Sequence, residues 1–262
     1  MKPLASLDAE TARKVRGLLF DLDDTLLTHG TLTRAAYDAL WSLAGAGLRL
    51  VAVTGRPSGW GEVLARQWPV DGVVTENGAV RISRDGRGIA LRERCDEAER
   101  ASRRTRLSRL VERVREAVPE AELADDVAAR RSDVTWDIGE RASLPEERIA
   151  AVVHLATQAG ARTTRSSVHL HASFDEDDKA SGAVAFLCER FGEDAGAARA
   201  HYAFVGDSAN DAACFGAFSV TFGVANVAAH VRRIVLPPRW VASRAMGDGF
   251  AEVAAALVGA RR

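Results

Sequence analysis

Short apolar segments alternate with amphipathic segments at the start of the chain. The segments 17–21, 48–53 and 72–75 are almost continuously apolar, as strands are when helices cover both faces of a sheet. The segments 33–46 and 58–67 between them predict helices, because apolar residues recur there at helical spacing. Strand, helix, strand, helix, strand is the order of a doubly wound α/β unit with a parallel sheet.

The pattern changes after residue 80. Gly86 and Gly88 separate two strand-like pieces, so we expect a hairpin over 81–92. The periodicity that follows predicts helix 94–117, strand 127–138, helix 145–159 and strand 162–172. These elements suggest a separate α+β module at residues 81–174.

The α/β pattern then returns. We expect helix 179–191, strand 202–205, the start of a helix at 211–215, strand 218–224 and helix 249–258. The module at 81–174 is therefore predicted to be inserted into one domain formed by residues 1–80 and 175–262.

The composition is that of a folded protein with its own core. Of the 262 residues, 47% are hydrophobic and 27% are charged, which excludes wholesale disorder. The 35 Lys and Arg residues nearly balance the 36 Asp and Glu residues, so the net charge is −1. This balance argues against a protein that binds nucleic acid through a broad positive surface, and we expect no nucleic-acid partner.

Cysteine usage and the absence of long apolar runs bear on the cell compartment. The 3 cysteines are far apart and lack the spacing of a zinc site or a disulfide framework. No run approaches about 18 apolar residues, so we expect no membrane span. The N-terminal segment also lacks the apolar stretch of a secretory signal. We therefore expect a cytoplasmic protein, and the sequence leaves its oligomeric state open.

Three carboxylates, Asp21, Asp23 and Asp24, lie at the end of the first predicted strand, in the segment 20–25, FDLDDT. Ligands of open α/β sheets bind beyond the carboxyl ends of the strands, where Asp21 and Asp23 would lie. Crowded carboxylates repel each other unless a cation is present, and Mg²⁺ is the usual cation where phosphate is handled. A solvated Asp-rich turn is the alternative for this segment on its own.

The loop after a later strand carries a second set of polar residues, Asp207, Asn210 and Asp211. Asp207 could complete a cation site with Asp21 and Asp23. Asn210 and Asp211 could orient those inner ligands from an outer shell.

The second predicted strand also ends in groups suited to phosphate. Thr54 supplies a hydroxyl and Gly55 a flexible turn, where a phosphoryl oxygen could bind. Each of the three loops alone could be a turn whose residues serve only its geometry. Because all three lie at the ends of apolar strands, one shared site is the better interpretation.

The order and spacing of these motifs resemble the haloacid dehalogenase (HAD) superfamily of phosphohydrolases. The motifs that match are DLDDT at 21–25, Thr54, Lys179 and GDSAND at 206–211. The large insert is similar to the type II cap of the IIB branch, which includes Cof-like and sucrose-phosphate phosphatases. The resemblance implies a HAD-like, Rossmann-like core with an inserted α+β cap. Asp24 departs from the Gly that many members of this branch carry.

The resemblance implies a role for each motif residue. Asp21 would be the nucleophile that forms an aspartyl-phosphate, and Asp23 the general acid and then the general base. Thr54 would donate a hydrogen bond to the phosphoryl group, and Lys179 would neutralise its charge.

The same resemblance implies Mg²⁺ as the cofactor. It would sit on Asp21, the backbone carbonyl of Asp23 and Asp207, with Asp211 in the outer shell. Lys179 has an alternative, because it follows an acidic run and could be an exposed residue at a helix N-terminus.

Substrate contacts are predicted from both parts of the chain. His169 and His171 alternate along a predicted strand and share one face, where they could contact a substrate or simply line a half-exposed sheet. The other candidates for substrate binding are Thr54, Gly55, Arg56, Lys179 and Asn210, followed by Asn77 and Arg165.

We therefore expect a Mg²⁺-dependent phosphomonoester hydrolase that acts on a small phosphorylated metabolite, foremost a sugar phosphate. One alternative is a phosphosugar mutase of the same branch, which needs a second basic phosphate site that is not evident in the sequence. Another is a non-catalytic protein that binds a phosphorylated ligand, against which the complete motif set argues. The sequence does not identify the metabolite.

Overall fold

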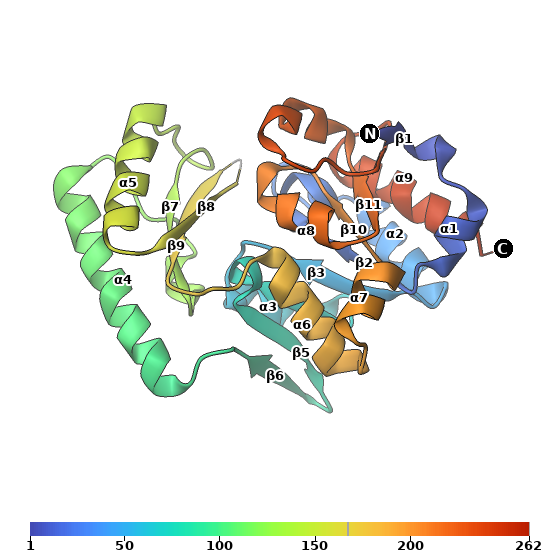
Figure 1. Cartoon of the computed structure of the whole chain (residues 1–262), viewed down its shortest axis with the longest axis horizontal. Helices are drawn as coiled ribbons and strands as arrows, with labels where there is room; N and C mark the ends of the chain where they lie inside the picture. Colours follow the sequence, from blue (N-terminus) through green and yellow to red (C-terminus); the bar gives the residue numbers. More distant parts are fainter. Residues whose placement is uncertain (167, 262) are drawn as a thin grey trace.

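The computed structural model describes residues 1–166 and 168–261, and in this part of the chain the strands form a large sheet and a small one (Figure 1). The large sheet has the order β1 (Lys2–Pro3), β12 (Trp240–Val241), β11 (Val220–Gly223), β10 (Tyr202–Gly206), β2 (Gly17–Phe20), β3 (Arg49–Val53), β4 (Gly72–Thr75), β5 (Val80–Asp85) and β6 (Gly88–Arg92). The small sheet has the order β7 (Asp133–Asp137), β9 (His169–Ser173) and β8 (Arg162–Arg165).

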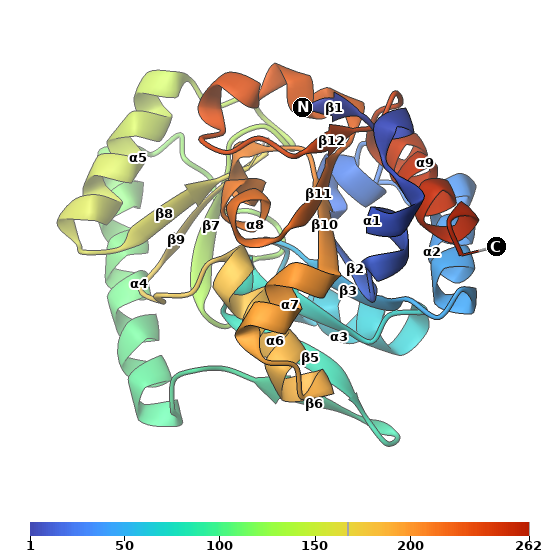
Figure 2. The same cartoon turned by 45° about the vertical axis from the view of Figure 1, so that its right-hand side comes forward.

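Helices cover both faces of the large sheet and one face of the small one (Figure 2). Those on the large sheet are α1 (Ala9–Lys14), α2 (Arg34–Gly45), α3 (Ser58–Gln67), α6 (Lys179–Phe191), α7 (Ala195–His201), α8 (Ala212–Ala217) and α9 (Met246–Gly259). Those on the small sheet are α4 (Glu97–Ala117) and α5 (Glu146–Gln158). Every helix in the described residues is too short or too polar to cross a membrane.

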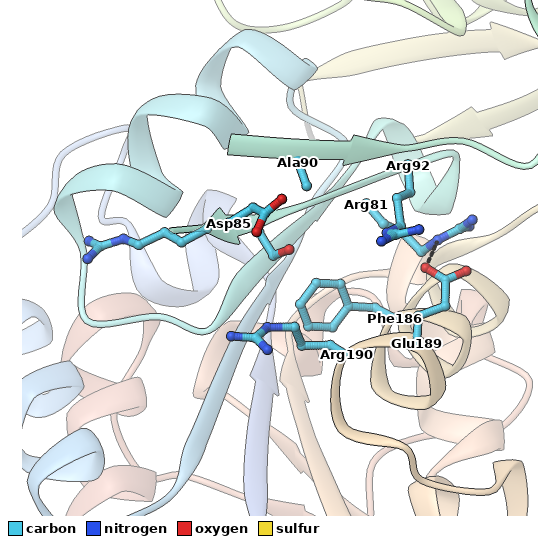
Figure 3. A pocket seen from close by; sticks show the side chains of 9 residues that line it. Arg81, Asp85, Ala90, Arg92, Phe186, Glu189 and Arg190 are labelled. Atoms are coloured by element: carbon cyan, nitrogen blue, oxygen red, sulfur yellow. Dashed lines mark hydrogen bonds and ion pairs between the residues drawn. The ribbon is translucent and has the colours of Figure 1, made fainter. Parts of the chain in front are cut away.

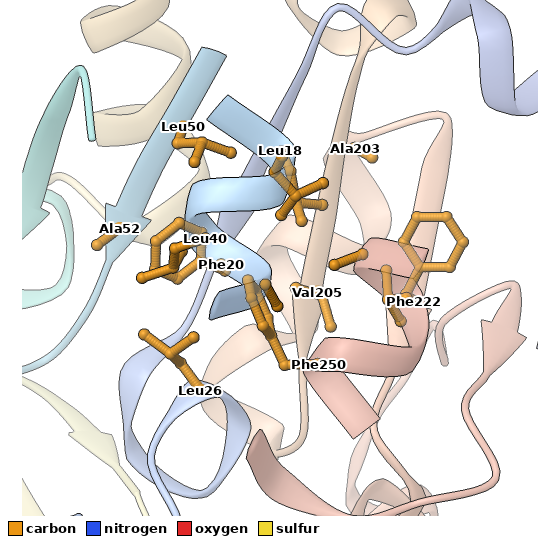
Figure 4. Close-up of a cluster of buried hydrophobic side chains, with 14 of the residues drawn as sticks. Leu18, Phe20, Leu26, Leu40, Leu50, Ala52, Ala203, Val205, Phe222 and Phe250 are labelled. Carbon is orange, nitrogen blue, oxygen red and sulfur yellow. The ribbon is translucent and has the colours of Figure 1, made fainter. Parts of the chain in front are cut away.

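Successive side chains of β2 point to opposite faces of the large sheet, and both faces are apolar. Leu18 and Phe20 belong to a cluster with residues of α2, α3 and α9, part of which is drawn in Figure 4. Phe20 meets Phe250 of α9 edge to face, with 5.3 Å between the ring centroids. Leu19 packs with α6, α7 and α8 on the other face. Burial on both sides explains why the strand is uninterruptedly apolar.

The strand pairing confirms the doubly wound α/β fold. β2 is parallel to β3 on one side and to β10 on the other. The chain passes from β2 to β3 and β4 on one side, and β10 and β11 follow much later on the other. The strand order thus reverses next to β2, and in such sheets the ligand crevice lies at this point, beyond the carboxyl ends of the strands.

The hairpin after β4 belongs to the large sheet. We had expected it to be the first part of the inserted module, which was predicted to begin at residue 81. β5 pairs antiparallel with β4, and β6 continues the sheet as its edge strand. The physical reason is burial, because Val80 and Ile82 fill the core under the large sheet. We propose that the inserted module begins after Arg92, while its expected end near residue 174 stays a prediction.

The small sheet also departs from one expected element. A single strand was expected over 162–172, but β8 and β9 are two antiparallel strands in this segment. The Ser166 N–H donates to the His169 carbonyl and closes the turn between them. The strand expected over 127–138 is shorter, because residues 127–129 form a 3-10 turn before β7.

The two faces of the small sheet differ in polarity. Trp136 and Leu170 face α4 and α5 within an apolar cluster. The residues that alternate with them are polar, and they are buried on the side of the large sheet. These polar residues are Asp133, Thr135, Asp137, His169 and His171.

Candidate active site

Asp21 and Asp207 follow two neighbouring parallel strands. β2 ends at Phe20 and β10 at Gly206, and the Asp21 N–H donates to the Val205 carbonyl at 3.0 Å. Because the strands are parallel, their carboxyl ends meet at one edge of the sheet. Both carboxylates are buried at this edge.

Lys179 points into the same place. It is the first residue of α6, which Asp178 and Ser181 begin with a capping box. Its Nζ donates to Asp21 Oδ1 at 2.8 Å and to Asp211 Oδ1 at 2.9 Å. Burial opposes the charge of the amine, but Asp21 and Asp211 outweigh burial and raise the pKa of Lys179. Lys179 is therefore a buried, charged group of the site and not an exposed residue of a helix end.

Asp21, Asp207 and Asp211 form an acidic cluster whose ligand oxygens lie within 4.8 Å of one another. Burial raises the pKa of Asp21 to about 7, although Lys179 opposes the shift. Burial and the neighbouring carboxylates also raise the pKa of Asp207. Three buried carboxylates exceed the one ammonium group of Lys179, and their oxygens are the ligands that Mg²⁺ prefers. These residues fit a divalent cation.

Two neighbours orient the carboxylate of Asp207. Thr25 Oγ1 donates to Oδ1 at 3.0 Å, and Asn226 Nδ2 donates to Oδ2 at 2.9 Å. Asn226 Nδ2 also lies 2.9 Å from the carbonyl of Asp24, so it ties the first acidic loop to the second. Asn226 was not among the expected site residues. The signal that could have found it is its position just after β11, a further strand of this sheet.

Asp211 and Asn210 hold the loop after β10. Asp211 Oδ2 accepts from the N–H groups of Asp207 and Ser208, at 2.9 and 3.1 Å. Asn210 Nδ2 donates to Asn77 Oδ1 at 3.1 Å, which connects this loop to the turn after β4. Asp211 thus supports the loop and Lys179 at once.

The carboxylate of Asp23 is not part of the acidic cluster and pairs with Arg56. Arg56 Nε lies 2.9 Å from Oδ2 of Asp23, and Nη2 lies 2.9 Å from Oδ1. Nη2 also donates to Glu140 of the insert at 2.8 Å. Burial opposes the charge of Arg56, but Asp23 and Glu140 outweigh it and raise the pKa. Arg56 therefore bridges the two modules, and its guanidinium is already occupied by carboxylates.

Thr54 and Gly55 directly follow β3, at a point where the inserted module lies close to the large sheet. Thr54 is buried, and its Oγ1 accepts from the Arg56 N–H at 3.0 Å. A Cβ added to Gly55 would lie 3.2 Å from Asn77 Oδ1 and 3.2 Å from His171 Nε2. The lack of a side chain at Gly55 thus lets the insert come close to the large sheet.

His169 and His171 face Gly55 and the acidic cluster, as residues of the same strand face. His171 Nδ1 lies 3.1 Å from a carboxylate oxygen of Asp133 and 2.9 Å from Thr135 Oγ1. Because a carboxylate only accepts, we assign the proton of the neutral ring to Nδ1, which leaves Nε2 as an acceptor. Burial lowers the pKa of both histidines.

Glu76 lies in the turn after β4 and joins the two modules. Its carboxylate accepts from the N–H groups of Arg131 and Ser132 in the insert, at 3.0 and 2.6 Å. Arg165 was a candidate for substrate contact, but it pairs with Glu146 within the insert at 2.6 Å. Arg165 does not line the cavities at the site.

Two cavities lie at the site, one beside the acidic cluster and one beside Asp23. The smaller, of about 10 Å³, borders Asp21 and Asp207 and is covered by His169 and His171. The larger, of about 230 Å³, lies beside Asp23. It is lined by residues of both modules, among them Asp24, His29, Arg56, Glu140 and Val168.

Residues 18–94 match the family model of the haloacid dehalogenase-like hydrolases. This match contains the loops of Asp21, Asp23 and Thr54. No curated protein matches the chain in sequence.

Solved structures share the fold of the whole chain. A protein from Thermoplasma acidophilum is 18% identical, with a TM-score of 0.71 over 91% of this chain and 96% of its own. A phosphatase of the haloalkanoate (HAD) superfamily from Bacteroides thetaiotaomicron is 19% identical, with a TM-score of 0.63 over 98% of this chain and 99% of its own. The sucrose-phosphatase of Synechocystis, solved with sucrose and phosphate, is 15% identical, with a TM-score of 0.64 over 93% and 98%. The comparison confirms the expected HAD fold.

Proposed function

We propose that this haloacid dehalogenase-like hydrolase is a Mg²⁺-dependent phosphatase that acts on a small phosphorylated metabolite, foremost a sugar phosphate, through an aspartyl-phosphate. The observation that carries the proposal is the position of Lys179. Its buried amine contacts Asp21 and Asp211 inside a cluster of three carboxylates. A buried cation beside a carboxylate nucleophile is what attack on an anionic phosphate requires.

The carboxylate of Asp21 would attack phosphorus while the bond from phosphorus to the ester oxygen breaks. Asp23 would give a proton to the departing oxygen. A water molecule would then attack the phospho-aspartate, lose its proton to Asp23 and release inorganic phosphate with the Asp21 carboxylate restored. The hydroxyl of Thr54 would bind a phosphoryl oxygen, and Gly55 would leave room for it.

Mg²⁺ would be held by Asp21 and Asp207, with the backbone carbonyl of Asp23 as a further ligand. Asp211 would not bind the ion directly but would lie in its outer shell. When bound, it would supply positive charge next to the phosphoryl oxygens. Thr25 and Asn226 fix the orientation of Asp207 through its two oxygens. Second-layer contacts of this kind tune metal affinity.

The leaving group would occupy the larger cavity, because this cavity borders Asp23, the proposed proton donor. Its volume of about 230 Å³ suits a small metabolite, and Glu140, His29 and other polar groups line it. His171 and Asn210 border the smaller cavity next to Asp21, and the acceptor Nε2 of His171 would take a hydroxyl hydrogen from the part of the substrate that extends there. The polar lining of both cavities supports a hydroxyl-rich leaving group such as a sugar.

The buried arginines beside the site do not favour a mutase. Arg56 is paired with Asp23 and Glu140, and Arg130 with Asp126 and Asp133. A mutase needs a second phosphate site with uncompensated positive charge, which these two arginines do not supply.

The test is release of phosphate from para-nitrophenyl phosphate by the pure protein, followed by a panel of sugar, nucleotide and glycerate phosphates. We expect hydrolysis that Mg²⁺ supports, that EDTA abolishes and that the variant Asp21→Asn lacks. Absence of hydrolysis with every phosphate ester would favour a non-catalytic role. Hydrolysis that persists in Asp21→Asn would exclude this carboxylate as the nucleophile.

A further inference from the structure

A third cavity, of about 200 Å³, lies between the β5–β6 hairpin and α6. Figure 3 shows its walls, with Ala90 and Arg92 on the hairpin and Phe186 and Arg190 on the helix. It shares no lining residue with the two cavities at the candidate active site. No step of the proposed reaction uses it.

Positive charge is in excess around this cavity. It is lined by four arginines, Arg81, Arg84, Arg92 and Arg190, and by two carboxylates, Asp85 and Glu189. The guanidinium of Arg84 is engaged elsewhere, because its Nε donates to the carbonyl of Ala65 at 2.6 Å. The carboxylate of Glu189 forms an ion pair with Arg81, whose Nε lies 3.2 Å from Oε2.

Arg81 and Arg92 are direct partners in the register of β5 and β6, so their side chains share one face. Like charges placed opposite each other on a sheet are destabilising unless an anion compensates them. Arg81 Nη1 is buried and makes no hydrogen bond with the described residues, and its closest carboxylate, that of Asp177, is 4.0 Å away. Glu189 therefore compensates only part of the charge of this pair.

Arg92 and Arg190 remain without a carboxylate partner in the described part of the chain. The guanidinium carbon of Arg190 lies 5.8 Å from the ring centroid of Phe191. Both arginines are exposed to solvent at the two walls of the cavity. Two guanidinium groups on opposite walls can bind the oxygens of one anion from both sides.

The lining of the cavity is mostly polar, and its apolar part is small. The ring of Phe186 forms this part on the helix side, and the small Ala90 lies on the hairpin side. A volume of about 200 Å³ is below the range of about 300 Å³ and more that pockets for drug-sized ligands have. The occupant must therefore be small, and Phe186 gives it one flat apolar surface to pack against.

We propose that this cavity is a binding site for a small organic dianion. Its carboxylate or phosphate oxygens would lie on Arg92 and Arg190, and its apolar part would pack against Phe186. The two guanidinium groups without a carboxylate partner in the described residues, those of Arg92 and Arg190, would face the two negative charges of the ligand. The site is separate from the one that would bind the substrate phosphate.

The test uses two probes that share a ring but differ in the oxyanion, phthalate and phenylphosphonate, with methylphosphonate as the control without a ring. The unmodified protein is treated with phenylglyoxal, which reacts with accessible arginines, and modified peptides are quantified by mass spectrometry. We expect the ring-bearing probes to protect Arg92 and Arg190. Arg87, an exposed arginine at the tip of the same hairpin, is the internal control and should stay reactive.

Calorimetric titration gives an independent readout. We expect the double substitution Arg92→Gln and Arg190→Gln to weaken binding of phthalate at least tenfold, and Arg87→Gln to leave it unchanged. Protection by only phthalate or only phenylphosphonate supports the site and identifies the oxyanion it accepts. The proposal is overturned if neither probe protects Arg92 and Arg190, if Arg87 is protected equally, or if the double variant binds phthalate like the wild type.

Discussion

Asp23 accepts a two-point hydrogen bond from Arg56, and the same guanidinium reaches Glu140 in the inserted module. The side chain proposed as the general acid is thus connected to the module that covers the site. The position of Asp23 consequently depends on whether Glu140 is in place. Arg56 was expected to contact substrate, and it lines the larger cavity. From its contact with Asp23 we propose that it also positions this carboxylate.

The first prediction concerns Arg56→Lys. A lysine keeps the charge but cannot make the planar two-point contact with Asp23. We expect kcat for para-nitrophenyl phosphate to fall about tenfold or more, with a smaller change in KM, because the acid loses its orientation. Steady-state kinetics measure this, with Arg66→Lys on the exposed side of α3 as the control. An unchanged kcat would show that Asp23 does not need Arg56.

The second prediction concerns Asp21→Asn, in protein freed of metal. Folding raises the pKa of Asp21 from 3.8 to about 7, so the folded state binds more protons than the unfolded state between these values. Stability is therefore lost as the pH rises through this window. An asparagine cannot ionise, so we expect it to stabilise the protein at pH 8 by roughly 1–2 kcal/mol, while activity falls about a thousandfold or more.

Thermal or urea unfolding in EDTA measures the effect of Asp21→Asn, with the exposed Asp38→Asn as its control. A variant less stable than the wild type at pH 8 would mean that the ion pair with Lys179 outweighs the burial of the charge.

The third prediction concerns Asn226→Ala. The substitution removes the hydrogen bond to Asp207 Oδ2 and the link to the carbonyl of Asp24. We expect the affinity for Mg²⁺ to fall about 10- to 100-fold, as is typical when a metal ligand loses its orienting partner. The rise in melting temperature on adding Mg²⁺ measures this without relying on turnover. Asn210→Ala is the comparison, because Asn210 bonds Asn77 and no cluster carboxylate; an equal loss in both variants would refute a specific role for Asn226.

The fourth prediction concerns His171→Gln and pH. Burial lowers the pKa of His171 in the folded state below the ordinary value of 6.5, although Asp133 opposes this. As the pH falls through about 6.5, His171 becomes protonated in the unfolded chain but stays neutral in the folded protein. The free energy of unfolding therefore decreases as the pH falls. We expect the wild type to lose about 1 kcal/mol more than the variant between about pH 7.5 and about pH 5.

Urea unfolding at several pH values tests the role of His171. The exposed His154→Gln serves as the control. If the stability of the wild type and of His171→Gln depended on pH in the same way, His171 would be excluded as the cause of the loss of stability at low pH.

The pattern of the chain predicted the large sheet well, because its strands are apolar on both faces and its helices are amphipathic. The hairpin at 81–92 was predicted as an element but not as part of that sheet, since pairing of β5 with β4 depends on where Val80 and Ile82 find a core. The turn between β8 and β9 was missed because alternation continues on both sides of it.

For the site, the position of residues at strand ends was informative, but their side-chain partners could not be predicted. Strand ends placed Asp21 and Asp207 together, and the structure shows that the amine of Lys179 bonds Asp21 and Asp211. The partners of Arg56 come from loops far apart in sequence, and no local pattern links Arg56 to Glu140. Asn226 was missed for the same reason, since its partners Asp24 and Asp207 lie in two other loops.

The small sheet presents Asp133, Thr135, Asp137 and the two histidines to the large module, not an apolar surface. If the modules separated, these groups would be hydrated, so parting them would forfeit little of the hydrophobic free energy that holds each module together. Each module keeps its own apolar core on other faces. The cover can thus lift to admit a solute and release a product without either half beginning to unfold.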